Sequence, residues 1–154
     1  MSDYQIRHFV AESNKIEDIL RAPLQKEIDI HRWFVELPFV GIPELIAVVS
    51  VLQPDAVLRE HEGLDVYVGN HTPPSGGADV PKALDYLLSL VGQLKPFQLH
   101  CNYERLHPFT DGNGRSGRLL WLWHMKQCGA LQRALQLGFL HTFYYQTLEA
   151  NDDR

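Results

Sequence analysis

The chain has 154 residues, 45% of them hydrophobic, and a formal net charge of −5, which suits a single globular domain with its own core, spanning residues 1–154. The acidic balance and the absence of a basic run argue against a nucleic-acid partner, and no apolar stretch approaches the ~20 residues of a membrane span. No signal-peptide pattern opens the sequence, and Cys101 and Cys128 have no metal-site spacing. We expect a reduced, cytoplasmic protein that binds neither nucleic acid nor membranes.

Apolar residues recur at helical spacing through most of the chain, which predicts a mostly α fold. Prolines separate the first segments, and Pro43 is placed to begin a helix. The helices expected in the first part of the chain cover residues 4–20, 28–37 and 43–52.

Between residues 64 and 77 the helical spacing is replaced by alternation, a Gly69-Asn70 turn signal and a loop rich in proline and glycine. These features predict a small β-hairpin or irregular flap. Helical spacing then returns, and we expect helices over residues 80–94, 97–106, about 113–128 and 139–150. The helix that begins near Asn113 is apolar on most faces, so we expect it to be central and buried.

The segment His107–Arg118 reads His-Pro-Phe-Thr-Asp-Gly-Asn-Gly-Arg-Ser-Gly-Arg and joins a loop to that central helix. Gly112 and Gly114 allow backbone N–H groups to approach a ligand, and the N-terminus of the helix favours an anion. Arg115 and Arg118 are three residues apart, so both lie on one helix face. The segment therefore predicts a phosphate cradle with two cationic clamps.

Two further side chains of this segment suit phosphate chemistry. Asp111 suits Mg²⁺, which proteins usually hold with one or two carboxylates together with substrate phosphates. His107 precedes the cradle and can act as a general base near neutral pH. No Gly-Lys-Ser/Thr follows the glycines, so the segment is not a Walker A loop.

The same segment resembles the signature of the Fic (Fido) family, His-x-Phe-x-Asp/Glu-Gly-Asn-Gly-Arg-x-x-Arg, at every fixed position. The resemblance is strong over residues 98–123 and weaker elsewhere. It implies a Fic-like helical domain with a small β-hairpin flap, and transfer of AMP from ATP, with Mg²⁺, to a Ser, Thr or Tyr hydroxyl of an unknown target protein. The related Doc-type kinases have Lys in place of Gly114, which favours nucleotidyl transfer over phosphoryl transfer here.

The resemblance also implies a role for each residue of the signature. His107 would take the proton of the attacking hydroxyl, Asp111 would hold Mg²⁺, and Asn113 would donate to the α-phosphate as charge develops there. The arginines would neutralise the pyrophosphate leaving group. The residues expected around the nucleotide are Gly112, Asn113, Gly114, Arg115, Arg118, Tyr144 and Asn151.

A second motif lies near the N-terminus, where Ser13 and Glu17 are four residues apart. Taken alone it suits a solvated helical turn, but it resembles the Ser/Thr-x-x-x-Glu-Gly/Asn motif of Fic proteins with an N-terminal inhibitory helix. In those proteins the Glu pairs with the second signature arginine, here Arg118. The resemblance implies that residues 1–22 inhibit the site and that no separate antitoxin is needed. Asp18 departs from Gly/Asn, which leaves the aim of Glu17 open.

Other functions stay open at this point. Glu17 could instead orient a water for removal of AMP from a modified protein, and another nucleotide could be the donor. A non-catalytic nucleotide-binding module is the reading from a different class, but such a module would have no use for His107. The flap could align a target segment by strand addition or be an ordinary surface hairpin. The sequence does not determine the target or the oligomeric state, and a homo-oligomer is compatible with it.

Overall fold

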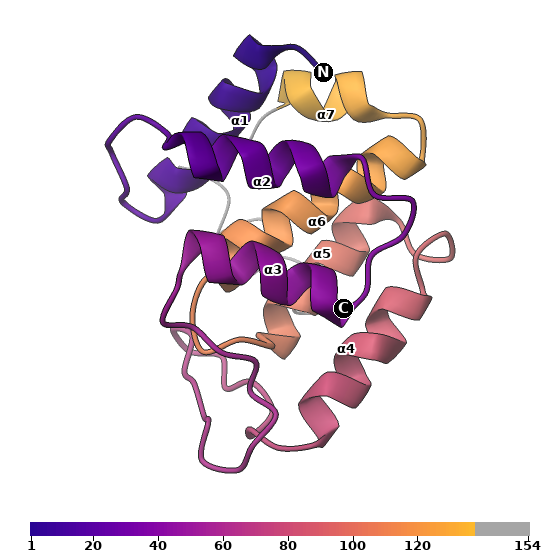
Figure 1. Cartoon of the computed structure of the whole chain (residues 1–154). Coiled ribbons are helices and arrows are strands. Elements are labelled where there is room, and N and C mark those ends of the chain that lie inside the picture. Colours follow the sequence, from indigo (N-terminus) through magenta and orange to yellow (C-terminus); the bar gives the residue numbers. More distant parts are fainter. Residues whose placement is uncertain (138–154) are drawn as a thin grey trace.

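The computed structural model of the chain describes residues 1–137, and seven helices form this part of it (Figure 1). Their bounds are α1 Asp3–Ile16, α2 Gln25–Val35, α3 Ile42–Leu52, α4 Asp79–Ser89, α5 Pro96–Leu106, α6 Asn113–Gln127 and α7 Leu131–Leu137. Within residues 1–137, pairing between extended segments is limited to isolated bridges. The prediction of a mostly α fold is confirmed.

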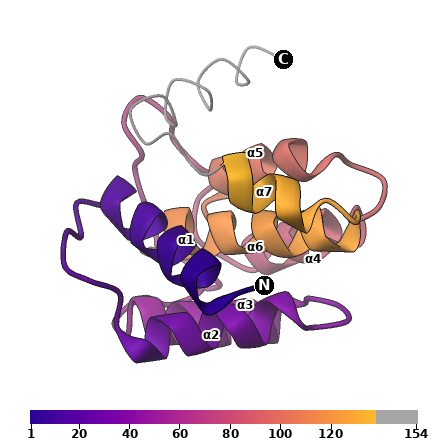
Figure 2. The ribbon, with the colours of Figure 1, turned by 90° about the horizontal axis from the view of Figure 1, so that it is seen from above.

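Helix α6 lies at the centre of the molecule. It contacts α2 and α3 on one side and α5 and α7 on another, and α1 also packs against it (Figure 2). Eleven of its 15 residues are buried, so the predicted central and buried helix is confirmed. The signature leads directly into this helix. The helices packed around α6 therefore also fix the position of the signature.

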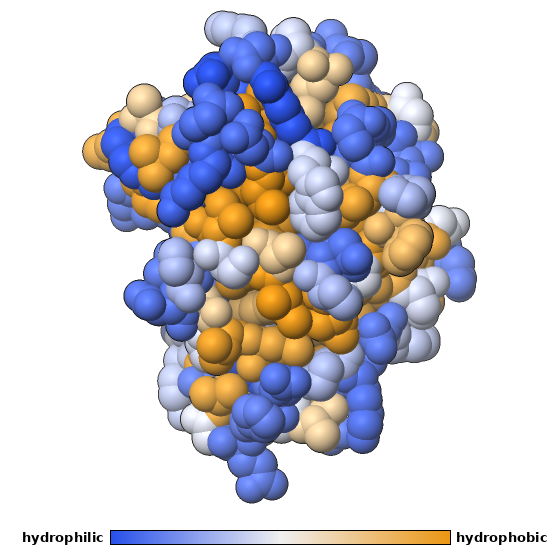
Figure 3. Space-filling view, viewed as in Figure 1, coloured by the Kyte–Doolittle hydropathy of each residue, from blue (hydrophilic) through white to orange (hydrophobic). Residues whose placement is uncertain are grey.

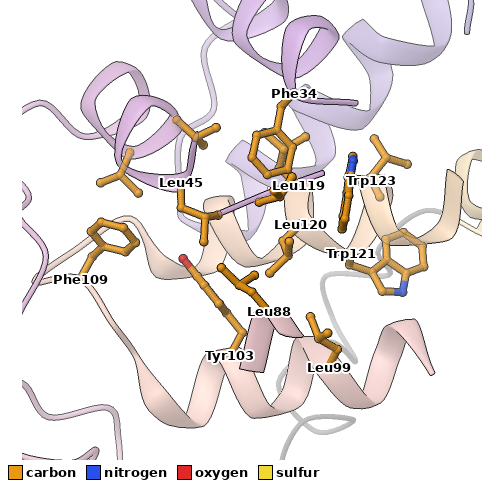
Figure 4. Close-up of a cluster of buried hydrophobic side chains, with 14 of the residues drawn as sticks. Phe34, Leu45, Leu88, Leu99, Tyr103, Phe109, Leu119, Leu120, Trp121 and Trp123 are labelled. Atoms are coloured by element: carbon orange, nitrogen blue, oxygen red, sulfur yellow. The ribbon is translucent and has the colours of Figure 1, made fainter. Parts of the chain in front are cut away.

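The core joins α6 to its neighbours through large apolar side chains (Figure 4). Those drawn around α6 include Phe34, Leu45, Leu88, Leu99, Tyr103, Phe109, Leu119, Leu120, Trp121 and Trp123. The buried hydroxyl of Tyr103 on α5 lies 2.8 Å from that of Ser116 on α6, so its polar end is satisfied within the core. This packing fixes the two helices that flank the signature loop.

Helix α1 ends earlier than its apolar pattern predicts, at Ile16 instead of Leu20. The N–H groups of Glu17 and Ile19 both bond to the carbonyl of Asn14, at 2.9 and 3.1 Å. Asp18 lies between them with a positive φ of 59°, so the chain turns out of the helix there. Ile19 comes after this turn, so it is not part of α1 although its apolar side chain fits the helical spacing.

The expected β-hairpin over residues 64–77 is reduced to a turn closed by one antiparallel bridge, Val68 with His71. Around it the segment forms an irregular loop, which we call the flap. Its backbone groups bond to side chains instead of to a second strand: the Gly76 N–H donates to Asp65 Oδ1 at 2.8 Å. A hairpin beyond this bridge is not shown, and the segment has the form of the irregular flap that the sequence also left open.

The other helix boundaries differ by a few residues from those predicted. Helix α2 begins at Gln25 instead of Ile28, and α4 ends at Ser89 instead of Leu94, with Gly92 at a φ of 88° beyond it. Helix α7 was not predicted. The helix expected over residues 139–150 lies outside the described residues.

The surface carries apolar side chains on the face where α2 and α3 lie (Figure 3). These two helices and their connection bear three large exposed ones, Trp33, Phe39 and Ile46. None of the helices in residues 1–137 combines the length and the apolar character needed to cross a membrane. Of the two cysteines, Cys101 is buried and Cys128 is exposed.

Candidate active site

His107 occupies the end of α5 in a left-handed conformation, with a φ of 49°. Its Nδ1 lies 3.3 Å from the carbonyl oxygen of Glu104. Because a carbonyl only accepts, Nδ1 carries the proton, and Nε2 keeps the lone pair that a general base requires. Burial lowers the pKa of His107, with the Arg59 cation adding in the same direction, which keeps the imidazole neutral at neutral pH.

Asn113 shapes the loop between His107 and α6. Its Oδ1 accepts from the N–H of Phe109 at 2.9 Å, and its Nδ2 donates to the carbonyl of Phe109 at 2.8 Å. The residue is buried, 1% exposed. This loop-closing role was not expected from the sequence, while donation to an α-phosphate stays a prediction.

Asp111 lies in an exposed position at the tip of this loop. Its Oδ1 accepts from the N–H of Gly112 at 2.7 Å, and Oδ2 has no hydrogen-bond partner in residues 1–137. No group of three or more potential ligands from His, Cys, Asp and Glu occurs within the described residues. A single exposed carboxylate fits Mg²⁺, which keeps waters and takes further oxygens from phosphates.

An anion cradle stays the prediction for the first turn of α6. Gly112 precedes the helix with a φ of 76°, a conformation that suits glycine. The carboxylate of Glu17 lies directly against Gly114, where an added Cβ would collide with Glu17 Oε1. A carboxylate therefore lies at the helix N-terminus, which favours anions through its unpaired N–H groups and its dipole.

The same carboxylate holds Arg118, as the second motif predicts. Arg118 is fully buried, and its Nη2 lies 2.7 Å from Glu17 Oε1, whose side chain is 33% exposed. Ser13 completes the contact: its Oγ accepts from Arg118 Nε at 2.8 Å and its carbonyl accepts from Nη2 at 2.9 Å. The three residues that the two motifs contribute are thus brought together by α1 and α6.

Asp18 adopts the left-handed conformation for which Gly and Asn are favoured. Aspartate tolerates this region better than most residues, so the departure from the family pattern does not redirect the chain. Glu17 still points at Arg118.

Arg115 bonds to the end of α3. Its Nη2 donates to the carbonyl of Leu52 at 2.6 Å and to Gln53 Oε1 at 3.0 Å, and the residue is only 5% exposed. Arg115 therefore contacts α3, whereas Arg118 contacts α1. A phosphate contact by Arg115 stays a prediction.

Glu27 was missed by sequence reasoning. This buried carboxylate accepts from Arg21 Nη2 at 2.8 Å and from the Leu24 N–H at 2.8 Å. Asn14 Nδ2 donates to it at 3.2 Å, and Arg115 Nη1 lies 3.7 Å away. Glu27 thus joins α1, the segment after it and α6. Its position as third residue of α2, from which a glutamate can reach back to the N-cap N–H, was the available signal.

Tyr144 and Asn151, expected near the nucleotide base, lie outside the described residues. The sequence of the described part nevertheless matches known proteins. The Fic/DOC family pattern matches residues 46–125, just over half of the chain.

Three relatives are similar over the same part of the chain. "Protein adenylyltransferase Fic" of Aedes aegypti is 31% identical over 96 residues, which are 56% of this chain and 19% of the relative. Proteins of the same name from Culex quinquefasciatus and Nematostella vectensis are 29% and 31% identical, over 60% and 59% of this chain and 20% and 23% of their own lengths. The chain spans about a fifth of the length of these curated relatives. With the signature complete and the family match covering its central helix, the chain belongs to the Fic/DOC family.

Proposed function

We propose that the protein is an adenylyltransferase that moves AMP from ATP to a Ser, Thr or Tyr hydroxyl of a target protein, and that Glu17 inhibits it. The observation that carries the proposal is the Glu17 carboxylate, bonded to Arg118 and seated against Gly114 at the start of α6. Its oxygens stand in for phosphate oxygens at a site suited to anions. The names of the relatives point to the same chemistry.

The proposed reaction is a displacement at the α-phosphorus. The hydroxyl oxygen of the target bonds to this phosphorus while the bond to the pyrophosphate oxygen breaks, and His107 Nε2 takes the hydroxyl proton. Backbone N–H groups at the start of α6 and the guanidinium of Arg118 would hold the phosphates. Mg²⁺ held by Asp111 would neutralise charge on the leaving pyrophosphate.

Glu17 opposes this reaction in two ways. It occupies Arg118, so the guanidinium is not available to a terminal phosphate. It also places a negative charge where that phosphate would lie, and like charges in a partly buried site repel strongly. Release of the end of α1 would therefore activate the enzyme.

The test is transfer of label from α-labelled ATP to proteins of a cell lysate in the presence of Mg²⁺. We expect little labelling with the wild type, strong labelling with Glu17→Gly, and none when His107→Ala is added to Glu17→Gly. An excess of unlabelled GTP or UTP should leave the labelling in place. Equal labelling by wild type and Glu17→Gly would rule out the inhibitory role, and labelling that survives His107→Ala would rule out the base.

Removal of AMP from a modified protein is the second candidate. One observation favours it: Glu17 Oε1 bonds to Arg118, but Oε2 has no hydrogen-bond partner in residues 1–137. A carboxylate held in this way could take a proton from water. Glu17→Gly distinguishes the two activities, because it should raise AMP transfer and abolish AMP removal from a pre-labelled protein.

A further inference from the structure

At the end of α5, next to His107, two side chains of the segment 59–77 bond to backbone carbonyls. The last carbonyls of a helix have no partner within it. Here His71 Nε2 lies 2.8 Å from the carbonyl of Arg105. Arg59 Nη2 donates to Leu106 at 2.9 Å, and Arg59 Nε donates to the His107 carbonyl at 2.7 Å.

Arg59 is fully buried, 0% exposed, and all its hydrogen-bond partners are backbone carbonyls. Its Nη1 donates to Leu64 at 3.1 Å and to Pro74 at 2.8 Å, at two ends of the flap. No carboxylate of residues 1–137 forms an ion pair with it. A buried cation is costly unless it is well bonded, and the C-terminus of a helix is where a cation gains from the dipole.

The backbone on both sides of His107 is held by this arrangement. The His107 N–H bonds to the Tyr103 carbonyl at 2.9 Å, and the Arg59 N–H bonds to the Pro108 carbonyl at 2.9 Å. His107 keeps a positive φ of 49°, which an L residue adopts at a cost and which its surroundings must therefore impose. The side chain and the main chain of Arg59 together supply two of those restraints.

We propose that Arg59 is a positioning residue for AMP transfer: its bonds to the end of α5 and to the flap fix the backbone of the base His107. This inference rests on the proposed function of the site. It also links the flap to the base, because the same guanidinium bonds to both. A shift of the flap at Leu64 or Pro74 would reach His107 through one side chain.

The charge of Arg59 gives the role a second readout. Burial lowers the pKa of His107, and the cation of Arg59 adds to the effect, as does the neighbouring His71 ring, while the Glu104 carbonyl and the charge of Asp111 oppose it. Replacing Arg59 with a neutral residue should therefore raise this pKa. The acid limb of kcat/KM, which reports ionisation of the free enzyme, should move to higher pH.

The experiment compares Arg59→Gln, Arg59→Lys and Arg32→Gln, each in the Glu17→Gly protein. Arg32 is the matched control, a surface arginine whose side chain is 44% exposed. We expect Arg59→Gln to lower kcat about 10- to 100-fold, as misplacement of a reacting group does, with the KM for ATP unchanged. Arg59→Lys should keep the acid limb in place and recover part of kcat, while Arg32→Gln should equal the parent.

An NMR titration of the His107 imidazole separates this inference from the proposed function. If the Glu17→Gly parent transfers no AMP, the proposed function fails, yet the titration still reads out whether Arg59 acts on His107. A folded Arg59→Gln protein with parental kcat and an unmoved His107 titration would overturn the inference. If Arg59→Gln does not fold, parental kcat in Arg59→Lys would overturn it, because lysine cannot reproduce the four carbonyl bonds.

Discussion

Gly114 and Asp18 are the two positions that decide where the Glu17 carboxylate lies. Gly114 leaves the space that the carboxylate fills, and a Cβ there would displace it. Asp18 turns the chain out of α1 at a φ of 59°, just after Glu17. Side-chain volume at one residue and backbone conformation at the other therefore set the contact with Arg118.

Substitutions at Asp18 test this conformation. Asp18→Gly and Asp18→Asn should keep wild-type stability and inhibition, because both residues accept a positive φ. Asp18→Val should lower the free energy of unfolding by about 1–2 kcal/mol and should raise AMP transfer, because the strained end of α1 no longer aims Glu17. Urea unfolding and labelling with ATP measure the two effects.

Lys15→Val is the control for that comparison, since Lys15 is exposed within α1. It should change stability far less than Asp18→Val and leave AMP transfer as in the wild type. Wild-type stability of Asp18→Val would show that the left-handed turn does not position Glu17.

Site residues could be predicted where they belong to a motif with fixed spacing in the sequence. The signature identified His107, and the Ser-x-x-x-Glu spacing identified the partner of Arg118, which the structure places at 2.7 Å. Glu27 and Arg59 escaped prediction because their partners are distant in sequence or are backbone carbonyls. A charged residue in a polar segment reads as solvent-exposed until its partners are known.

At the scale of elements, the approach of α5 to α6 depends on Gly117. A Cβ at this position would lie 2.5 Å from Glu104 Oε1 and 2.9 Å from Cδ1 of the buried ring of Tyr103. Gly117 therefore allows α5 and α6 to pack closely. Because His107 directly follows α5 and α6 begins beside Gly112, their separation sets the geometry of the site.

Gly117→Ala should therefore push the two helices apart. Overpacking of a core costs typically 1–3 kcal/mol, so we expect a loss of about that size in the free energy of unfolding, measured with urea. Gln127→Ala, at an exposed position of the same helix, should have little effect. If the Gly117→Ala protein were as stable as the Gln127→Ala protein, α5 and α6 would not be closely packed at Gly117.

Helices were predictable from apolar spacing, while their ends and the flap were less so. Pro43 lies in the first turn of α3, as expected. Between a hairpin and an irregular flap the sequence could not decide, and in the structure Arg59 and Asp65 bond to flap backbone groups. Alternation in a short segment reports which side chains are apolar, but not which groups bond the backbone.

At the scale of the whole molecule, buried histidines couple stability to pH. Burial, more than any other effect, lowers the pKa of His31 to about 4 and of His100 to about 3. Burial also lowers the pKa of His124. In the unfolded chain these histidines bind protons below about pH 6.5. In the folded chain the same side chains stay neutral until much lower pH.

Stability should accordingly fall as pH decreases from about 6.5 toward 4, because the unfolded state binds more protons in that window. The slope from two such histidines approaches about 2.7 kcal/mol per pH unit. The double variant His31→Asn, His100→Asn should remove most of this slope. The Asn amide can replace the Nδ1–H groups that donate to the backbone carbonyls of Glu27 and Gly117. Urea midpoints across this range measure the slope, and an equal slope in the double variant would contradict the assignment.

Inhibition as proposed requires that the Glu17 carboxylate occupies the place of an ATP phosphate at Arg118 and the start of α6. Calorimetric titration with Mg²⁺ and ATP tests it most directly. Glu17→Gly should bind ATP about tenfold to a hundredfold more tightly than the wild type, the equivalent of one charge-assisted bond to phosphate. AMP, which lacks the outer phosphates, should bind both proteins equally, and adding Arg118→Ala should cancel the gain. Equal affinity of wild type and Glu17→Gly for ATP would contradict the claim.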